Sequence, residues 1–116
     1  MFAISFDTRL IATLKNDRSI DIARGLITTN EQGQIEMLTP IEHRLLQRLL
    51  MSPNQVVSTT ILIQYAWVTD TDHAESNKLH VYIKKLRSKL GEDSSNPEYI
   101  INVRGAGYMF ILDTIN

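Results

Sequence analysis

The sequence contains no cysteine, so neither a disulfide framework nor a thiolate metal site is available to the fold. It has no run of about 18 apolar residues, and we therefore predict no membrane-spanning helix. The first four residues do not form the basic start and apolar core of a secretory signal. The formal net charge is only −1, which argues against indiscriminate binding to nucleic acid. We expect residues 1–116 to form one domain that buries its own core.

The patterns that mark enzymes are missing as well. His43, His73 and His80 are scattered, and none is spaced with carboxylates as a metal site requires. No nucleophile elbow, phosphate-binding loop or dinucleotide fingerprint is present. Gly105-Ala-Gly107 resembles a glycine loop, but it lies between two strand-like runs instead of opening a helix. We therefore predict that the chain is not an enzyme and that it needs no metal or cofactor.

Positive charge is concentrated in one amphipathic segment. Residues 75–90 hold one acid against five lysines and arginines. Apolar residues recur there at steps of four, three and four, which predicts a helix with one buried stripe: Leu79, Ile83, Leu86 and Leu90. Asp72 and Glu75 can form a capping box at its start, and Gly91 is placed to terminate it.

The opposite face of this helix carries mainly polar and basic side chains, namely Asn77, Lys78, Val81, Lys84, Lys85 and Ser88, with Arg87 at its edge. A solvated lysine face is one interpretation, because such faces are common on soluble helices. The next segment favours another, since residues 99–103 and 108–112 are β-rich runs around a turn at 104–107. Glycines allow that turn to be tight, with Arg104 at its tip. A basic helix beside a hairpin tip offers two probes for adjacent grooves of DNA.

The remaining segments predict a scaffold for these two elements. Residues 1–38 indicate a small antiparallel sheet with no chemistry of its own, from strand-like runs at 2–6, 10–14, 19–23, 26–29 and 35–38. Thr39-Pro40-Ile41-Glu42 starts a helix with a capping box. That helix continues to about Met51 and is expected to bury Ile41, Leu45, Leu46 and Leu49.

Ser58 is a plausible cap for a second helix, which runs from Thr59 to about Trp67. This helix is apolar nearly all round, so we expect it to be wedged between neighbours. The chain order is therefore an N-terminal sheet (1–38), a three-helix bundle (39–91) and a hairpin (99–112). This order predicts an α+β fold, a winged helix-turn-helix with an N-terminal antiparallel sheet.

These residues resemble the DNA-binding domain of the OmpR/PhoB family, including its ToxR-like branch, over roughly residues 19–112. Three signatures carry the resemblance: Leu38-Thr-Pro-Ile-Glu42 with Leu45-Leu46; Val57-Ser58 through Ala66-Trp67; and Val81-Tyr-Ile-Lys-Lys-Leu-Arg87 followed by Val103-Arg-Gly-Ala-Gly-Tyr108. The resemblance implies that the third helix enters the major groove and the wing tip enters the adjoining minor groove. It also implies that the loop at residues 68–74 contacts RNA polymerase or a neighbouring subunit.

The resemblance implies that the family's major-groove positions are occupied in this chain by Asn77, Lys78, Val81, Lys84 and Lys85. Val81 matches a position whose side chain can touch a thymine methyl. Lys85 matches a position at which the family often has an arginine that contacts bases. The positions that resemble phosphate contacts are Tyr82, Arg87 and Trp67. Arg104 matches the wing arginine of the minor groove, with Asn102 and Tyr108 beside it on the backbone. Core anchoring is an equal alternative for Trp67 and Tyr108.

Departures from the family's pattern suggest a divergent member. Lys84 and Lys85 cannot make arginine's planar two-point contact with guanine, so DNA shape is expected to contribute more to recognition. His43 replaces the usual aromatic of the first helix, which we interpret as a tolerated change. Thr59, Thr60 and Met109 also replace frequent charged residues.

The sequence thus predicts sequence-specific binding to double-stranded promoter DNA in bacterial transcription regulation, of the kind used in two-component signalling. We expect dimers on DNA and a cytoplasmic location. No receiver-like segment precedes the sheet, which leaves a stand-alone regulator, an effector domain of a longer chain, or a ToxR-like head on the cytoplasmic face of the inner membrane. The alternative function is a winged-helix module that buries its third helix against a protein partner.

Overall fold

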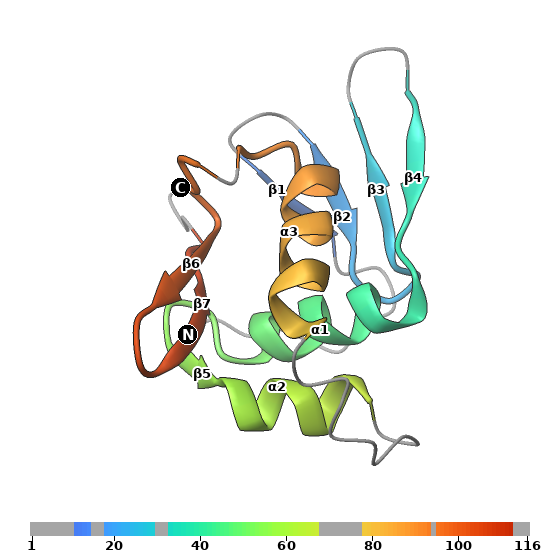
Figure 1. Cartoon of the computed structure of the whole chain (residues 1–116). Helices are drawn as coiled ribbons and strands as arrows, with labels where there is room; N and C mark the ends of the chain where they lie inside the picture. Colours follow the sequence, from blue (N-terminus) through green and yellow to red (C-terminus); the bar gives the residue numbers. More distant parts are fainter. Residues whose placement is uncertain (1–10, 15–17, 30–32, 68–77, 94, 113–116) are drawn as a thin grey trace.

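The computed structural model describes residues 11–14, 18–29, 33–67, 78–93 and 95–112. Across these residues a four-stranded sheet and a three-stranded sheet lie around three helices (Figure 1). Each sheet is antiparallel throughout. The predicted α+β class, with an N-terminal sheet, three helices and a C-terminal hairpin, is therefore confirmed. The predicted strand at residues 2–6 lies outside the described residues.

The N-terminal sheet is a simple meander in the order β1-β2-β3-β4. Its strands are short, at three residues each: β1 Ile11–Thr13, β2 Ser19–Asp21, β3 Leu26–Thr28 and β4 Ile35–Met37. Ile20 and Ile27 face each other across β2 and β3 and are fully buried. The sheet therefore contributes one apolar face to the core, although β4 at its edge is exposed along its length.

Helix α1 (Pro40–Met51) begins as its sequence predicts. The Thr39 hydroxyl accepts the Glu42 backbone N–H at 3.3 Å, and the Glu42 carboxylate accepts the Thr39 backbone N–H at 2.9 Å. Leu45, Leu46 and Leu49 are fully buried as expected. Ile41 is half-buried at the edge of the core instead of inside it.

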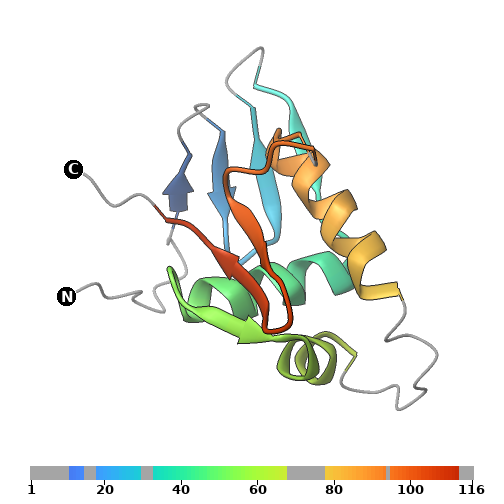
Figure 2. The same cartoon turned by 60° about the vertical axis from the view of Figure 1, so that its left-hand side comes forward.

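Helix α2 (Thr59–Ala66) is not wedged between neighbours, so that expectation was wrong. Within the helix, Leu62 and Ala66 are buried, whereas Ile61 is 40% exposed. The helix packs on α1 and lies at one end of the molecule, as both views show (Figure 1, Figure 2). An all-round apolar sequence misled the prediction because, among the described residues, α2 packs mainly on α1 and leaves Ile61 partly exposed.

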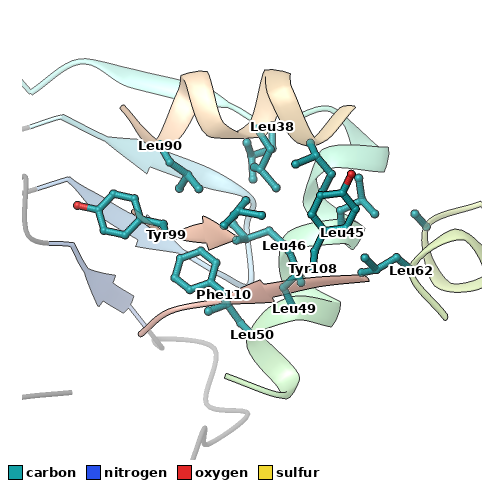
Figure 3. Packing of buried hydrophobic residues seen from close by; sticks show 14 of the residues in the cluster. Leu38, Leu45, Leu46, Leu49, Leu50, Leu62, Leu90, Tyr99, Tyr108 and Phe110 are labelled. Atoms are coloured by element: carbon teal, nitrogen blue, oxygen red, sulfur yellow. The ribbon is translucent and has the colours of Figure 1, made fainter. Parts of the chain in front are cut away.

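Helix α3 (Leu79–Leu90) buries the predicted stripe, since Leu79, Ile83, Leu86 and Leu90 all belong to the core. Gly91 terminates the helix in a left-handed conformation with φ of 84°. Asp72 and Glu75, the residues of the predicted cap, lie outside the described residues, and α3 itself begins at Leu79, with Lys78 at the N-cap position and no side-chain cap hydrogen bond. In the close view, Leu90 lies above Leu46 of α1, with Tyr99 and Phe110 beside them (Figure 3). One core cluster therefore joins the two sheets and the three helices.

The C-terminal sheet contains a strand that the sequence did not predict. Its order is β5-β7-β6, with β5 at Val56–Ser58, β6 at Ile100–Val103 and β7 at Gly107–Phe110. Val56-Val57 was interpreted as a lead into α2, but it pairs antiparallel with β7. The hairpin is therefore held on the body of the protein by a strand from the connection between α1 and α2.

Candidate nucleic-acid interface

The outer face of α3 gathers the predicted basic residues. Lys78, Lys84 and Lys85 are exposed, and Val81 between them is 39% exposed. This face is opposite the buried stripe, so the helix presents these side chains to any ligand that approaches from solvent. Asn77, the fifth predicted major-groove residue, lies outside the described residues.

Tyr82 links this face to the end of α2. Its ring meets Trp67 edge to face, with ring centroids 5.5 Å apart and planes at 79°. The Lys85 ammonium lies 5.3 Å from the centroid of the Tyr82 ring, within cation–π range. Trp67 is only 8% exposed, so it does anchor the core. Its contact with a phosphate stays a prediction.

Two basic residues of α3 turn inward, which the sequence did not reveal. The Arg87 guanidinium donates to the Ile100 carbonyl through Nε at 3.1 Å and through Nη2 at 2.8 Å. Lys89 Nζ lies 2.6 Å from the buried Glu42 carboxylate and donates to the Met37 carbonyl at 3.1 Å. The exposed charge of α3 is therefore smaller than the sequence suggests. Arg87 has a structural role whether or not it also contacts a phosphate.

The hairpin carries the other predicted contacts. Arg104 is exposed at the turn between β6 and β7, where Gly105 has φ of 78° and Ala106 N–H donates to the Val103 carbonyl at 2.9 Å. Asn102 is exposed, and Tyr108, opposite it in the strand register, is 6% exposed. Both views place the hairpin turn and the N-terminal end of α3 at the same end of the molecule (Figure 1, Figure 2).

Burial raises the pKa of the Tyr108 phenol above its ordinary value of 10.0, while the charge of Arg87 opposes the rise. The hydroxyl is therefore a neutral donor at physiological pH. A raised folded-state pKa contributes stability below the unfolded pKa and loses it as pH rises through the folded value. We expect Tyr108→Phe to remove a phenol with a raised pKa from an alkaline absorbance titration, and to lessen the loss of stability at high pH. Removal of a phenol with an ordinary pKa would contradict this.

No helix among the described residues is long and apolar enough to cross a membrane. No three histidine, aspartate or glutamate side chains come together as a possible metal site within the parts of the chain that the structure describes.

The domain is a winged helix-turn-helix of the DNA-binding class. Three features define it: the helices α2 and α3, the hairpin paired to β5, and the exposed basic face of α3. The family described as "Transcriptional regulatory protein, C terminal" matches residues 33–110. The chain belongs to this family of OmpR/PhoB-type domains, as its sequence signatures predicted. The family consists of transcription factors and not of enzymes.

Curated relatives are similar over most of this chain. The probable transcriptional regulator ycf27 of Galdieria sulphuraria is 38% identical over 92 residues, which cover 78% of this chain and 35% of that protein. The DNA-binding response regulator MtrA of Mycolicibacterium smegmatis is 34% identical over 92 residues, covering 79% and 39%. The chain thus spans little more than a third of the length of these relatives.

Solved structures share the fold. The DNA-binding domain of CadC from E. coli has a TM-score of 0.70 at 22% identity, covering 90% of this chain and 94% of that one. The Klebsiella pneumoniae RstA DNA-binding domain, solved with the RstA box, has a TM-score of 0.67 at 22% identity, covering 87% and 96%. At this identity the likeness shows the fold alone.

Proposed function

We propose that this chain binds double-stranded promoter DNA in a sequence-specific manner and so regulates transcription. Helix α3 would lie in the major groove, and the hairpin tip would lie in the adjoining minor groove. The observation that carries the proposal is the exposure of Lys78, Val81, Lys84 and Lys85 on α3 and of Arg104 at the hairpin turn. That turn lies at the same end of the molecule as the N-terminal end of α3 (Figure 1, Figure 2). Family membership and the RstA domain solved with its DNA site support it.

Charge explains how a chain of net charge −1 can bind DNA. Among the described residues, no carboxylate pairs with Lys84 or Lys85, whereas the inward-turned Arg87 and Lys89 each face a glutamate. The unpaired lysines can therefore neutralise phosphates and release condensed counterions. Affinity should consequently fall steeply as the salt concentration rises.

Base selection should be shared between the helix and DNA shape. Lysine offers a single ammonium where arginine would offer a planar fork, so Lys84 and Lys85 discriminate guanine weakly. Val81, exposed between the lysines, can contact a thymine methyl. Arg104 at the hairpin tip would respond to the width of the minor groove, which depends on sequence without base-edge contacts.

The test is selection of bound sites from random duplex DNA, followed by Kd measurements on the enriched site. We expect Lys85→Ala and Arg104→Ala each to weaken binding about tenfold. Arg24→Ala is the matched control, because it removes one exposed positive charge at the N-terminal sheet and should change Kd little. Failure to enrich any sequence, or unchanged Kd in both variants, would overturn the proposal. If a protein partner co-purified in that case, the module would instead bind proteins.

We propose further that two copies bind together. One chain presents one α3 and one hairpin, which suffice for one half-site. Enriched sites should therefore contain two half-sites separated by about one helical turn of DNA. A single isolated half-site bound with full affinity by one chain would contradict the dimer.

An RNA polymerase contact at residues 68–74 is also part of the proposal, although that segment lies outside the described residues. Substitutions there should lower transcription from a target promoter without changing Kd for its DNA. Because promoter DNA in bacteria is in the cytoplasm, we propose that the domain works in that compartment.

A further inference from the structure

The segment between α3 and the hairpin is held by one buried carboxylate. Glu92 Oε1 accepts the backbone N–H groups of Glu98 and Tyr99, each at 2.6 Å. Its other oxygen accepts the Ile100 N–H at 3.1 Å. The Glu92 side chain is 2% exposed. A carboxylate with three backbone donors is firmly placed, so the start of β6 is fixed relative to the end of α3.

Arg87 completes this arrangement from within α3. Its Nε and Nη2 both donate to the Ile100 carbonyl, and Nε lies 3.8 Å from Glu92 Oε2. One ion pair thus binds both backbone polar groups of Ile100. We call Arg87, Glu92 and the Ile100 backbone the helix–wing clamp.

The clamp acts on the free edge of the C-terminal sheet. In the order β5-β7-β6, strand β6 has a partner on one side, and Ile100 lies opposite Phe110 of β7. The N–H and carbonyl of Ile100 point away from β7 and would otherwise need water or another strand. The clamp supplies these partners: the Glu92 carboxylate accepts the Ile100 N–H, and two N–H groups of Arg87 donate to the Ile100 carbonyl. Strand β6 is thereby joined to α3 by direct hydrogen bonds.

The hairpin does not need the clamp in order to form. Strand β7 is paired on both sides, and Ile100 and Phe110 are fully buried. Loss of the clamp should therefore leave a folded hairpin whose angle to α3 is less restricted. The four residues of β6 span about 13 Å, so a tilt of about 10° at Ile100 moves the turn by about 2 Å. A hydrogen bond or ion pair at Arg104 would not survive that displacement.

We propose that Arg87 and Glu92 are positioning residues that fix the spacing between the two DNA-reading elements, α3 and the Arg104 turn. This inference rests on the proposed function. It gives Arg87 a role distinct from the phosphate contact that the family resemblance implies. Arg87→Lys separates the two roles, because it keeps the charge and loses the two-point contact with Ile100.

The first test is a pair of double-mutant cycles on the enriched duplex, because coupling is measured by non-additivity. We expect Arg104→Ala to weaken binding about tenfold in the wild-type protein but only about twofold in Glu92→Gln or Arg87→Lys. Lys85→Ala should weaken binding about tenfold in all three backgrounds, since α3 still docks. Stoichiometric titration gives the active fraction of each variant, so partial unfolding cannot imitate coupling.

The second test does not depend on DNA. The chain lacks cysteine, so spin labels can be attached at Ser88→Cys and Ala106→Cys, two exposed positions on α3 and at the hairpin turn. We expect a narrow distance distribution in the otherwise wild-type protein and a broader one in Glu92→Gln. An unchanged width, or additive cycles for Arg104→Ala, would overturn the clamp and leave the proposed function standing. Absence of specific binding by the wild-type protein would instead remove the proposed function.

Discussion

Gly107→Ala should destabilise the protein by about 4 kcal/mol or more, because it combines overpacking with backbone strain. A Cβ at this position would overlap the Val57 carbonyl oxygen and lie 2.8 Å from the Cα of Ser58. Gly107 also has φ of 149°, which L side chains rarely adopt. Neither obstacle is a flexible side chain, because both atoms belong to the β5 backbone that pairs with Gly107. The variant must therefore open the β5–β7 pairing or unfold.

The matched control is Gly105→Ala in the same turn. Gly105 has φ of 78°, but a Cβ there meets no atom of the described residues within 4 Å. Its expected cost is only the left-handed backbone penalty, about 1–2 kcal/mol. Urea unfolding followed by circular dichroism measures both losses against the wild-type protein. Equal losses of unfolding free energy in Gly107→Ala and Gly105→Ala would contradict the prediction, because β5 would then have moved to accommodate the added methyl group.

Lys89→Met should lower the free energy of unfolding by about 3 kcal/mol at neutral pH, because it leaves a buried charge without its partner. Glu42 is 1% exposed, and Lys89 Nζ lies 2.6 Å from its Oε1. Without the ammonium, the carboxylate keeps the Thr39 N–H at 2.9 Å. Methionine preserves much of the lysine stem, so the loss reports mainly the missing charge.

Lys84→Met is the control, because Lys84 is exposed on the same helix and should change stability by less than about 0.5 kcal/mol. Replacing both partners, Glu42→Gln with Lys89→Met, should cost less than the sum of the single variants, since no charge is then buried alone. The free energies come from urea unfolding with equal m-values. A Lys89→Met protein as stable as Lys84→Met would contradict the proposed value of this pair.

The predictions from sequence succeeded where the signal is local. The capping box of Thr39 and Glu42 involves residues three apart, and its chemistry can be read from neighbours along the chain. The stripe from Leu79 to Leu90 succeeded for the same reason, because helical periodicity alone decides which side chains share a face. The same periodicity predicted that Lys84 and Lys85 lie on the exposed face of the helix. The turn glycines predicted that Arg104 lies at the hairpin tip, and all three residues are exposed.

The failures all involve partners distant in sequence. The β5 strand became visible only through its pairing with β7, roughly fifty residues further along the chain. Ile61 on α2 is 40% exposed in the part of the chain that the structure describes, although the helix is apolar nearly all round, because helix periodicity does not report which side has a neighbour. For His43 the sequence predicted no contact at all, whereas in the structure its Nε2 lies 2.7 Å from the Ile22 carbonyl oxygen and its ring lies close to Gly25.

The starts of α1 and α2, the buried stripe, the hairpin and the family signatures depend on residues close together in sequence, and the amino-acid sequence sufficed to predict them. The roles of the charged residues at the end of α3 depend on tertiary packing. Arg87 and Lys89 have the same local pattern as the exposed lysines, but Ile100 is 13 residues away and Glu42 is 47. Folding brings these partners within hydrogen-bond distance, because burial of the common core sets the positions of α1, α3 and β6. Only that packing decided which positive charges of α3 stay exposed, as Lys84 and Lys85 do, and which turn inward, as Arg87 and Lys89 do.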